Sequence, residues 1–194
     1  LFRSRAIREG KTKYSENAGL LALRQAIARY LARTEGLSYD PASQIVVTPG
    51  AMGALFLALK VLLNPGDEVI VNEPCWTNYI QQIRMCGGVP VSVKTDAQRG
   101  FDLDVSAVAE TITSKTKAII LNSPCNPTGA VASAETLSQL AKLAQERDLV
   151  VLADEVYKHI LFDGRTYTGF ATLPGMKERT LVIDSLSKTY AMTG

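Results

Sequence analysis

The sequence has 194 residues, of which 46% are hydrophobic and 21% charged, a composition that suits one globular domain and excludes a disordered chain. Its 21 Lys and Arg against 19 Asp and Glu leave a formal charge of +2, and its apolar runs are far shorter than the roughly 20 residues that span a bilayer, so neither nucleic acid nor a membrane is an expected partner. Three cysteines and one histidine are too few for a zinc cage or a multi-disulfide scaffold, so we expect no metal and a reducing, cytoplasmic location.

Apolar residues spaced three to four apart predict helices in several parts of the chain. The clearest are residues 1–10, 19–35, 54–63 and 133–147. Gly10 ends the first of these segments and Gly36 follows the second, as glycines often do at helix carboxyl ends.

Six short runs rich in β-branched residues predict buried strands. They cover residues 45–48, 69–71, 89–93, 118–121, 149–153 and 180–184. Because helical patterns fill most of the gaps, we expect an α/β fold, a three-layer α/β/α arrangement with a mainly parallel sheet. The strand at 89–93 ends in no distinctive chemistry, and we place it at an edge of the sheet.

Ligands of such sheets bind outside the carboxyl ends of the strands, so the residues that follow each strand are candidates for a site. Gly50, Ala51 and Met52 open a helix after the first predicted strand, where free backbone amides can bind a phosphate; an ordinary tight turn is the alternative. Trp76 could stack on a planar ring, or it could be a core residue. Asn126, within NSPCNPTG, could present its amide to a ligand, or it could only form an Asn-Pro turn.

Two further strand ends carry ionisable side chains. Asp154 follows four apolar residues, where a carboxylate is costly unless it is paired; a protonated ring nitrogen would be one partner, and helix capping is the alternative role. Tyr157 would lie on the same side as Asp154, and Glu155 would point away. Lys188 follows Ser185 after the last strand and could form an imine, although it could also be one more surface lysine.

Taken in order, several of these motifs resemble the pyridoxal-phosphate-binding domain of the class I/II aminotransferases, which are fold-type-I enzymes. The motifs are Gly50-Ala51-Met52, Trp76, Asn126-Pro127-Thr128-Gly129, Asp154-x-x-Tyr157 and Ser185-x-Ser187-Lys188. The resemblance covers essentially the whole chain. It implies an enzyme that moves an amino group between an amino acid and a 2-oxo acid, with pyridoxal 5'-phosphate as cofactor.

The resemblance also implies a role for each matching residue. Lys188 would hold the cofactor as an aldimine and move the α-proton, and Asp154 would keep the ring nitrogen protonated. Asn126 and Tyr157 would bind the phenolic oxygen, and Trp76 would stack on the ring. The remaining cofactor-binding residues would be Gly50, Ala51, Met52, Ser185 and Ser187, together with Tyr14 from a partner subunit. Cis peptide bonds are expected before Pro74 and Pro127.

Tyr14 in that role implies a homodimer. We expect residues 1–194 to be a single partial cofactor-binding large domain, without the amino-terminal arm, the last strand of the sheet and the carboxyl-terminal small domain. The small domain carries the arginine that binds the substrate carboxylate in the family, so we expect residues 1–194 alone to be inactive.

Other functions remain open on the sequence. A lyase of the same fold shares the cofactor apparatus, and related domains act as ligand sensors in transcription regulators. Gly50-x-x-Gly53 followed by Glu73 partly matches a dinucleotide-binding fingerprint, but its first glycine is absent. Ser185-x-x-Lys188 matches a serine acyl-transfer motif, but S-D-N and K-T-G do not follow it.

Overall fold

The computed structural model describes residues 2–193. The chain forms two compact units, Leu1–Thr48 and Pro49–Gly194. Leu1, where the first predicted helix begins, and Gly194, the last residue of the resemblance, lie outside the described residues.

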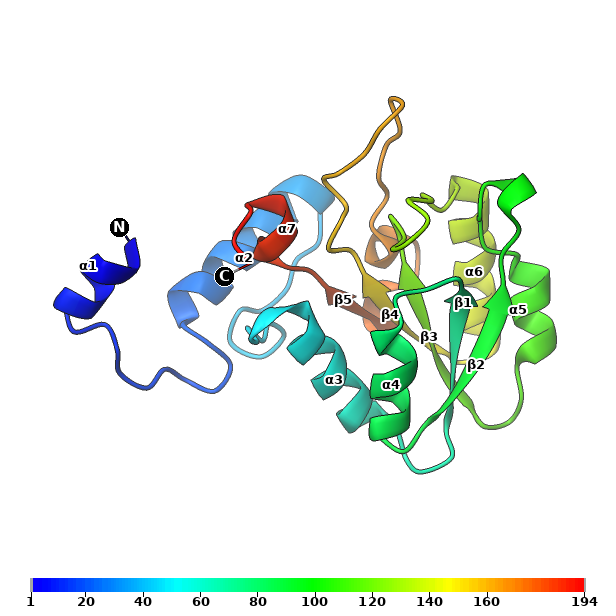
Figure 1. Cartoon of the computed structure of the whole chain (residues 1–194), viewed down its shortest axis with the longest axis horizontal. Coiled ribbons are helices and arrows are strands. Elements are labelled where there is room, and N and C mark those ends of the chain that lie inside the picture. The colour runs from blue at the N-terminus through cyan, green and yellow to red at the C-terminus, as the bar shows by residue number, and fades with distance from the viewer. Residues whose placement is uncertain (1, 194) are drawn as a thin grey trace. The chain divides into compact units, whose positions relative to one another are not determined.

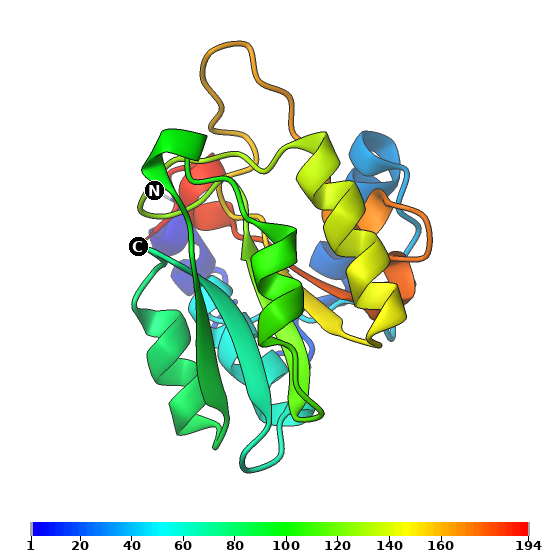
Figure 2. The ribbon, with the colours of Figure 1, turned by 90° about the vertical axis from the view of Figure 1, so that its right-hand side faces the viewer.

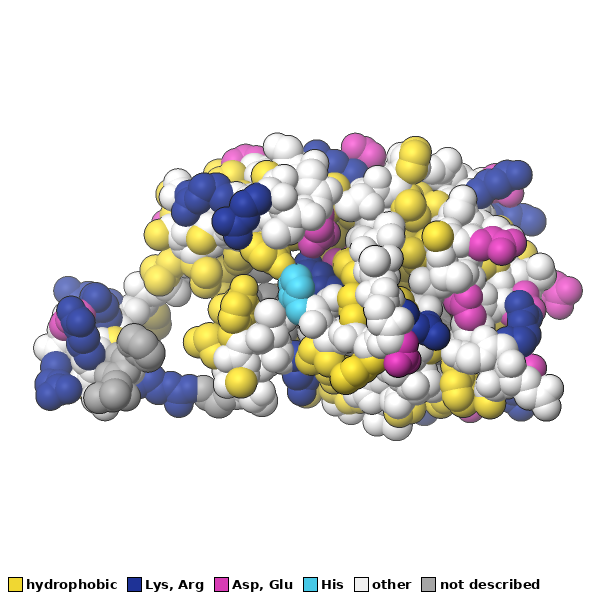
Figure 3. Space-filling model, turned by 90° about the horizontal axis from the view of Figure 1, so that it is seen from above, with side chains coloured by type: hydrophobic (Ala, Val, Ile, Leu, Met, Phe, Trp, Pro, Cys, Tyr) yellow, Lys and Arg dark blue, Asp and Glu magenta, His cyan; other side chains and the backbone are white. Residues whose placement is uncertain are grey.

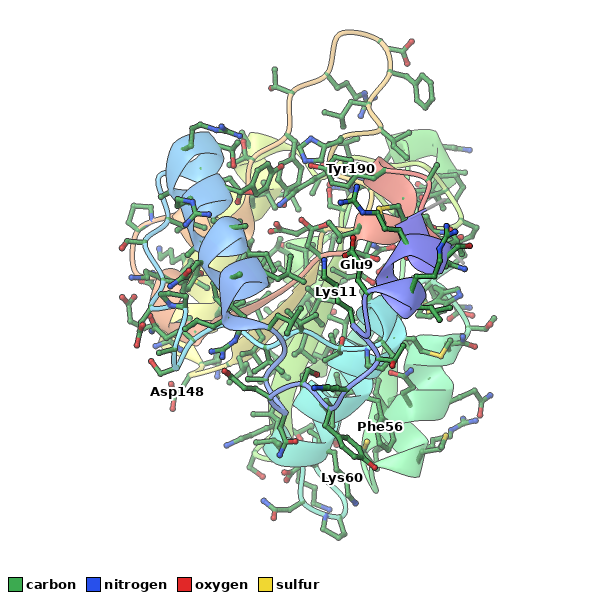
Figure 4. The ribbon with its side chains drawn as sticks, turned by 90° about the vertical axis from the view of Figure 1, so that its left-hand side faces the viewer. Glu9, Lys11, Phe56, Lys60, Asp148 and Tyr190 are labelled. Carbon is green, nitrogen blue, oxygen red and sulfur yellow. The ribbon has the colours of Figure 1, made fainter. Side chains whose placement is uncertain are left out.

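The smaller unit contains two helices, α1 (Phe2–Arg8) and α2 (Leu21–Glu35), close to the predicted bounds. Gly36 ends α2 in the left-handed conformation, with φ of 69°, and its N–H donates to the carbonyl oxygen of Leu31. The buried Arg24 side chain pairs with Glu16 and donates to the carbonyl oxygen of Pro41 at 2.6 Å, so it ties the segments before and after α2 together. After α1, the side chains of Glu9 and Lys11 form an ion pair of 2.6 Å (Figure 4).

The prediction of a strand at 45–48 is wrong, because these residues belong to no sheet. The Val47 N–H donates instead to the carbonyl oxygen of Ala18, and the Val47 side chain packs tightly over Gly19. β-Branched residues favour an extended backbone, but a strand also requires a neighbouring strand to complete its hydrogen bonds. Residues 2–193 supply no such neighbour for this segment.

The larger unit is built on a sheet of five parallel strands (Figure 1). The strands are β1 (Glu68–Glu73), β2 (Val89–Lys94), β3 (Thr116–Asn122), β4 (Val150–Asp154) and β5 (Thr180–Ile183), in the order β2-β1-β3-β4-β5. The parallel sheet and the position of β2 at an edge are therefore confirmed.

Helices cover both faces of this sheet (Figure 2), which confirms the three-layer α/β/α arrangement. These are α3 (Gly50–Leu62) and α4 (Asn78–Met85) on one face, and α5 (Val105–Thr111) and α6 (Ala134–Glu146) on the other. The short helix α7 (Leu186–Thr189) follows β5 and buries none of its residues, and 3-10 helices lie at Ala97–Arg99, Phe170–Thr172 and Lys177–Arg179. Successive side chains along a strand point to opposite helical layers. In β1, Val69 and Val71 pack with α3 and α4, whereas Ile70 packs with α5 and α6.

One helix begins earlier than the sequence pattern predicts. We expected a turn at residues 50–53 and a helix from residue 54, but α3 already begins at Gly50. Gly50 begins the helix with a φ of 77°, which glycine adopts without strain, and Ala, Leu and Met then favour helix strongly. The backbone amides of Gly50, Ala51 and Met52 therefore belong to the amino-terminal turn of the helix itself.

The surface carries mixed charge. On the face shown in Figure 3, Lys and Arg side chains are interspersed with Asp and Glu over the larger unit, so this face has no broad field of one sign. Within residues 2–193, no helix has both the length and the apolar character that crossing a membrane requires.

Candidate functional site

The candidate residues gather at the carboxyl edge of the parallel sheet. Asn122 at the end of β3 pairs in register with Asp154 at the end of β4, and Asp154 pairs with Ile183 at the end of β5. Three adjacent strands thus end at the same level. The chain segments that leave them start from one place, as is typical of ligand sites in open α/β sheets.

Asp154 is the central ionisable group of this edge. It is only 5% exposed, and its Oδ2 accepts a hydrogen bond of 2.5 Å from the hydroxyl of Tyr79. Burial raises the pKa of Asp154, the hydrogen bonds from Tyr79 and from the Val156 N–H oppose this rise, and the nearby charge of Asp184 adds to it. Burial also raises the pKa of Tyr79, as does the negative charge of Asp154, so Tyr79 stays a donor.

The Asp154 carboxylate has no cationic partner in the described part of the chain. No Lys, Arg or His nitrogen of residues 2–193 lies within 4.0 Å of it. The sequence led us to expect a partner for this carboxylate, and the partners within residues 2–193 are two neutral donors, the Tyr79 hydroxyl and the Val156 N–H. Asp154 can therefore still pair with a cationic group of a ligand.

Trp76 belongs to the same array. Its ring meets that of Tyr79 edge to face, with centroids 5.3 Å apart and an interplanar angle of 87°. Trp76 is half-buried, and it packs on the core that α3 and α4 form with the sheet. Tyr79 therefore joins the only tryptophan of the chain to the buried carboxylate.

Asn126 is held beside Asp154 by a second asparagine. The Asn126 N–H donates to Oδ1 of Asn122 at 2.8 Å, and Nδ2 of Asn122 donates to the carbonyl oxygen of Asp154 at 3.0 Å. Among residues 2–193, the Asn126 side-chain amide has no hydrogen-bond partner, so it can contact a ligand. The peptide bonds before Pro74 and Pro127 are cis as predicted, and the bond before Pro124 is also cis, which we did not predict.

Lys188 and Tyr157 lie together above the ends of β4 and β5. The Lys188 Nζ is 5.9 Å from the centroid of the Tyr157 ring, and the lysine side chain is exposed. Ser185 precedes α7 as its amino-terminal cap, and its Oγ accepts a hydrogen bond of 3.1 Å from the Ser187 N–H. Tyr190 follows α7 with its side chain exposed (Figure 4).

The amino end of α3 reaches the same core. Pro49 caps this helix without any side-chain hydrogen bond. Ala51 packs in the cluster that holds Trp76 and Tyr79, and Nε2 of Gln82 on α4 donates to the carbonyl oxygen of Met52 at 3.2 Å. A helix end without a side-chain cap can accept an anion.

Tyr14 belongs to the smaller unit, where it lies between α1 and α2 with its side chain fully exposed. Glu155 points away from Asp154 as expected, because its Oε1 accepts a hydrogen bond from the Phe170 N–H on the opposite side of the sheet.

Sequence reasoning missed three residues of this edge: Tyr79, Asn122 and Lys158. Tyr79 follows Trp76 by three residues, which is a helical spacing that could have paired them. Asn122 ends an apolar strand, where a buried polar side chain needs partners. Nothing in the sequence indicated that Lys158 is buried.

The residues of this edge suit a planar, cationic ligand that carries a phosphate and an aldehyde. A buried carboxylate without a protein cation can pair with a protonated ring nitrogen, and an indole can stack on the ring. The amino end of α3 and the Ser185 hydroxyl can bind a phosphate. The Lys188 amine can react with an aldehyde.

Comparison with known proteins agrees with this chemistry. A model of the family described as aminotransferase class I and II matches residues 3–194. The chain is 44% identical to the aspartate/prephenate aminotransferase of Thermus thermophilus over 98% of its own length and 48% of that protein. It is 41% identical to the aspartate aminotransferase of Pyrococcus abyssi over 97% of its own length and 49% of that protein.

Solved structures give the same result. The aromatic aminotransferase of Pyrococcus horikoshii matches with a TM-score of 0.96 and 41% identity, over 100% of this chain and 52% of that structure. This chain therefore spans about half the length of the curated relatives it matches.

Proposed function

From the premise that this chain belongs to the class I and II aminotransferase family, we propose that the whole protein moves an amino group from an amino acid to a 2-oxo acid with the help of pyridoxal 5'-phosphate. The observation that carries the proposal is the buried Asp154 carboxylate, which pairs with no Lys, Arg or His of residues 2–193 and lies at the edge where Trp76 and Lys188 also lie. When bound, the cofactor supplies an electron sink that stabilises negative charge at the substrate α-carbon.

Asp154 keeps the ring nitrogen of that sink protonated. The hydroxyl of Tyr79 donates to one carboxylate oxygen at 2.5 Å and lowers the pKa of Asp154 against the effect of burial. The same hydrogen bond fixes the orientation of the carboxylate. Trp76, whose ring meets that of Tyr79 edge to face, would stack on the cofactor ring.

Lys188 and Tyr157 act at the other end of the ring. The Lys188 amine would hold the cofactor through its aldehyde group and would move the proton at the substrate α-carbon. Tyr157, whose ring centroid lies 5.9 Å from the Lys188 Nζ, would bind the phenolic oxygen together with Asn126. Positive charge on Lys188 is stabilised by the face of the Tyr157 ring.

The phosphate is bound by groups from two helix ends. Gly50, Ala51 and Met52 offer the first amides of α3, and Ser185 and Ser187 lie at the start of α7. The partial positive charge at the amino end of the 13-residue α3 favours the anion.

Tyr14 completes the phosphate site from the partner subunit of a homodimer. The fully exposed side chain of Tyr14 in the smaller unit is available for such a contact. We place residues 1–194 in one large cofactor-binding domain of a cytoplasmic enzyme. The three cysteines, all within the described residues, are free thiols, which is consistent with that location.

An assay of the full-length protein tests this function. Aspartate is the first donor to test, because two relatives are named for it. With pyridoxal phosphate, aspartate and 2-oxoglutarate, we expect glutamate to form, and we expect Lys188→Ala to lower the rate at least ~10³-fold.

The acceptor separates the candidate reactions. A transaminase needs the 2-oxo acid for sustained turnover, whereas a lyase releases product from the amino acid alone. Turnover that is independent of the acceptor would favour the lyase. Cofactor binding without turnover across a panel of amino donors would favour a ligand sensor.

A further inference from the structure

A buried lysine lies next to the proposed cofactor site and has no role in the chemistry above. Lys158 is 3% exposed, and its Nζ lies 2.9 Å from Oδ2 of Asp184 and 3.8 Å from Oε2 of Glu155. Taking an ammonium group out of water is costly unless it is paired. The close contact with Asp184 is therefore the main link that this lysine makes to the segment after β5.

Asp184 passes this contact on to the start of α7. Its Oδ1 accepts a hydrogen bond of 2.7 Å from the Ser185 N–H, and Oγ of Ser185 accepts one of 3.1 Å from the Ser187 N–H. The Asp184 side chain is 33% exposed, so without Lys158 it could turn toward water. A chain of polar contacts thus runs from Lys158 to the residue that precedes Lys188.

The segment from Glu155 to Lys158 touches the segment from Ile183 to Lys188 at three points. The Glu155 N–H donates to the carbonyl oxygen of Ile183 at 2.8 Å, and the Tyr157 ring lies beneath the Lys188 amine. The third point is the ion pair between Lys158 and Asp184, which is the contact closest in sequence to Ser185. Two consecutive residues, Tyr157 and Lys158, therefore face both ends of the short stretch that carries Ser185, Ser187 and Lys188.

We propose that Lys158 is a positioning residue of the cofactor site, which acts through Asp184 to fix the Ser185 amide and hydroxyl at the start of α7. The purpose of that positioning rests on the proposed function, since it holds Ser185 toward the cofactor phosphate. Lys158 also offsets the charge of Asp184, which is one of the influences that raise the pKa of Asp154.

A double-mutant cycle in the full-length protein tests the proposal with Lys158→Met, Asp184→Asn and the double variant. In the cofactor-free protein, we expect amide hydrogen exchange of the peptide covering residues 183–190 to be about tenfold faster in each single variant. The double variant should be no faster than either single one, because both changes break the same contact. Exchange in α6 should stay at the wild-type rate.

Two measurements on the loaded protein separate positioning from a general loss of structure. The dissociation constant of pyridoxal phosphate should rise about tenfold in both single variants, with no further rise in the double one. The absorption band of the bound cofactor should shift in opposite directions in the two single variants. Lys158→Met leaves an extra negative charge beside Asp154, whereas Asp184→Asn removes one.

Lys142→Met, which removes an exposed lysine from α6, is the matched control and should leave all three readouts unchanged. The proposal is overturned if Lys158→Met matches the wild type in exchange, if the single effects multiply in the double variant, or if both bands shift the same way. Should Lys158→Met fail to fold, Asp184→Asn still decides, because it leaves Lys158 its contact with Glu155. Failure of the wild-type protein to bind pyridoxal phosphate would refute the proposed function, while exchange in the cofactor-free protein would still decide the role of Lys158.

Discussion

Asp154 shows how a single residue couples folding to the site. Desolvation disfavours its ionised form, so burial raises its pKa above the ordinary value for an aspartate, and the Tyr79 and Val156 hydrogen bonds recover only part of that cost. The ionised form of Asp154 is therefore expected to lower the free energy of unfolding of the cofactor-free protein. It becomes favourable only when a cation binds beside it.

This cost predicts a pH dependence for Asp154→Asn in the cofactor-free protein. An acid with a raised folded pKa contributes stability that is present below its unfolded pKa, about 3.9, and is lost as the pH rises through the folded value. The free energy of unfolding of the wild type, minus that of Asp154→Asn, should therefore fall between pH 4 and pH 8. Urea unfolding at a series of pH values measures this difference.

Asp163→Asn, which changes an exposed aspartate, is the control for removal of a carboxyl group. A difference for Asp154→Asn that grew with pH would mean that the folded protein stabilises the ionised form of Asp154, which is the opposite of the effect expected from its burial.

At the scale of helices and strands, the sequence pattern of a segment predicted its structure well where the stabilising interactions lie within that segment. The helices α2 and α6 begin and end within two residues of their predicted bounds, because apolar spacing and capping residues lie in the same short segment. The segment 45–48 failed as a strand because strand formation depends on a neighbour that the local pattern does not contain.

The cap of α6 gives a quantitative test at this scale. Oγ of Ser133 accepts a hydrogen bond of 3.0 Å from the Thr136 N–H. Ser133→Ala should lower the free energy of unfolding by about 1 kcal/mol, because one of the first amides of α6 loses its partner.

Ser133→Asn keeps an acceptor at the same position and should retain most of the stability. Equal losses in the two variants, measured by urea unfolding, would show that the cap does not contribute as proposed.

At the scale of the whole molecule, the sequence predicted where the candidate residues lie in the fold better than it predicted what they touch. Asp154 and Trp76 were expected at strand ends, but the link between them through Tyr79 was not. The Tyr79–Asp154 contact joins residues 75 positions apart, and only the assembled sheet and α4 bring them together. The Lys158–Asp184 pair was missed for the same reason.

The proposed dimer makes a prediction about Tyr14. In a homodimer in which both subunits carry Tyr14→Phe, the dissociation constant of pyridoxal phosphate should rise about tenfold, because the contact of the Tyr14 hydroxyl with the phosphate is lost. A mixed dimer with one Tyr14→Phe subunit and one Lys188→Ala subunit combines an intact Lys188 with an intact Tyr14 in one of its two sites. That site should bind the cofactor as tightly as the wild type.

Titration of purified mixed dimers measures this recovery. If Tyr14 acted on its own subunit, the site with the intact Lys188 would keep the defect, and no tight site would appear.

The central claim is that Lys188 faces the aldehyde of a cofactor bound at the carboxyl edge of the sheet. Borohydride reduction of the full-length protein loaded with pyridoxal phosphate, followed by peptide mapping, tests it most directly. We predict a pyridoxyl group on the Nζ of Lys188 and its absence from Lys188→Ala. A pyridoxyl group on another lysine, or on none, would contradict this role of Lys188.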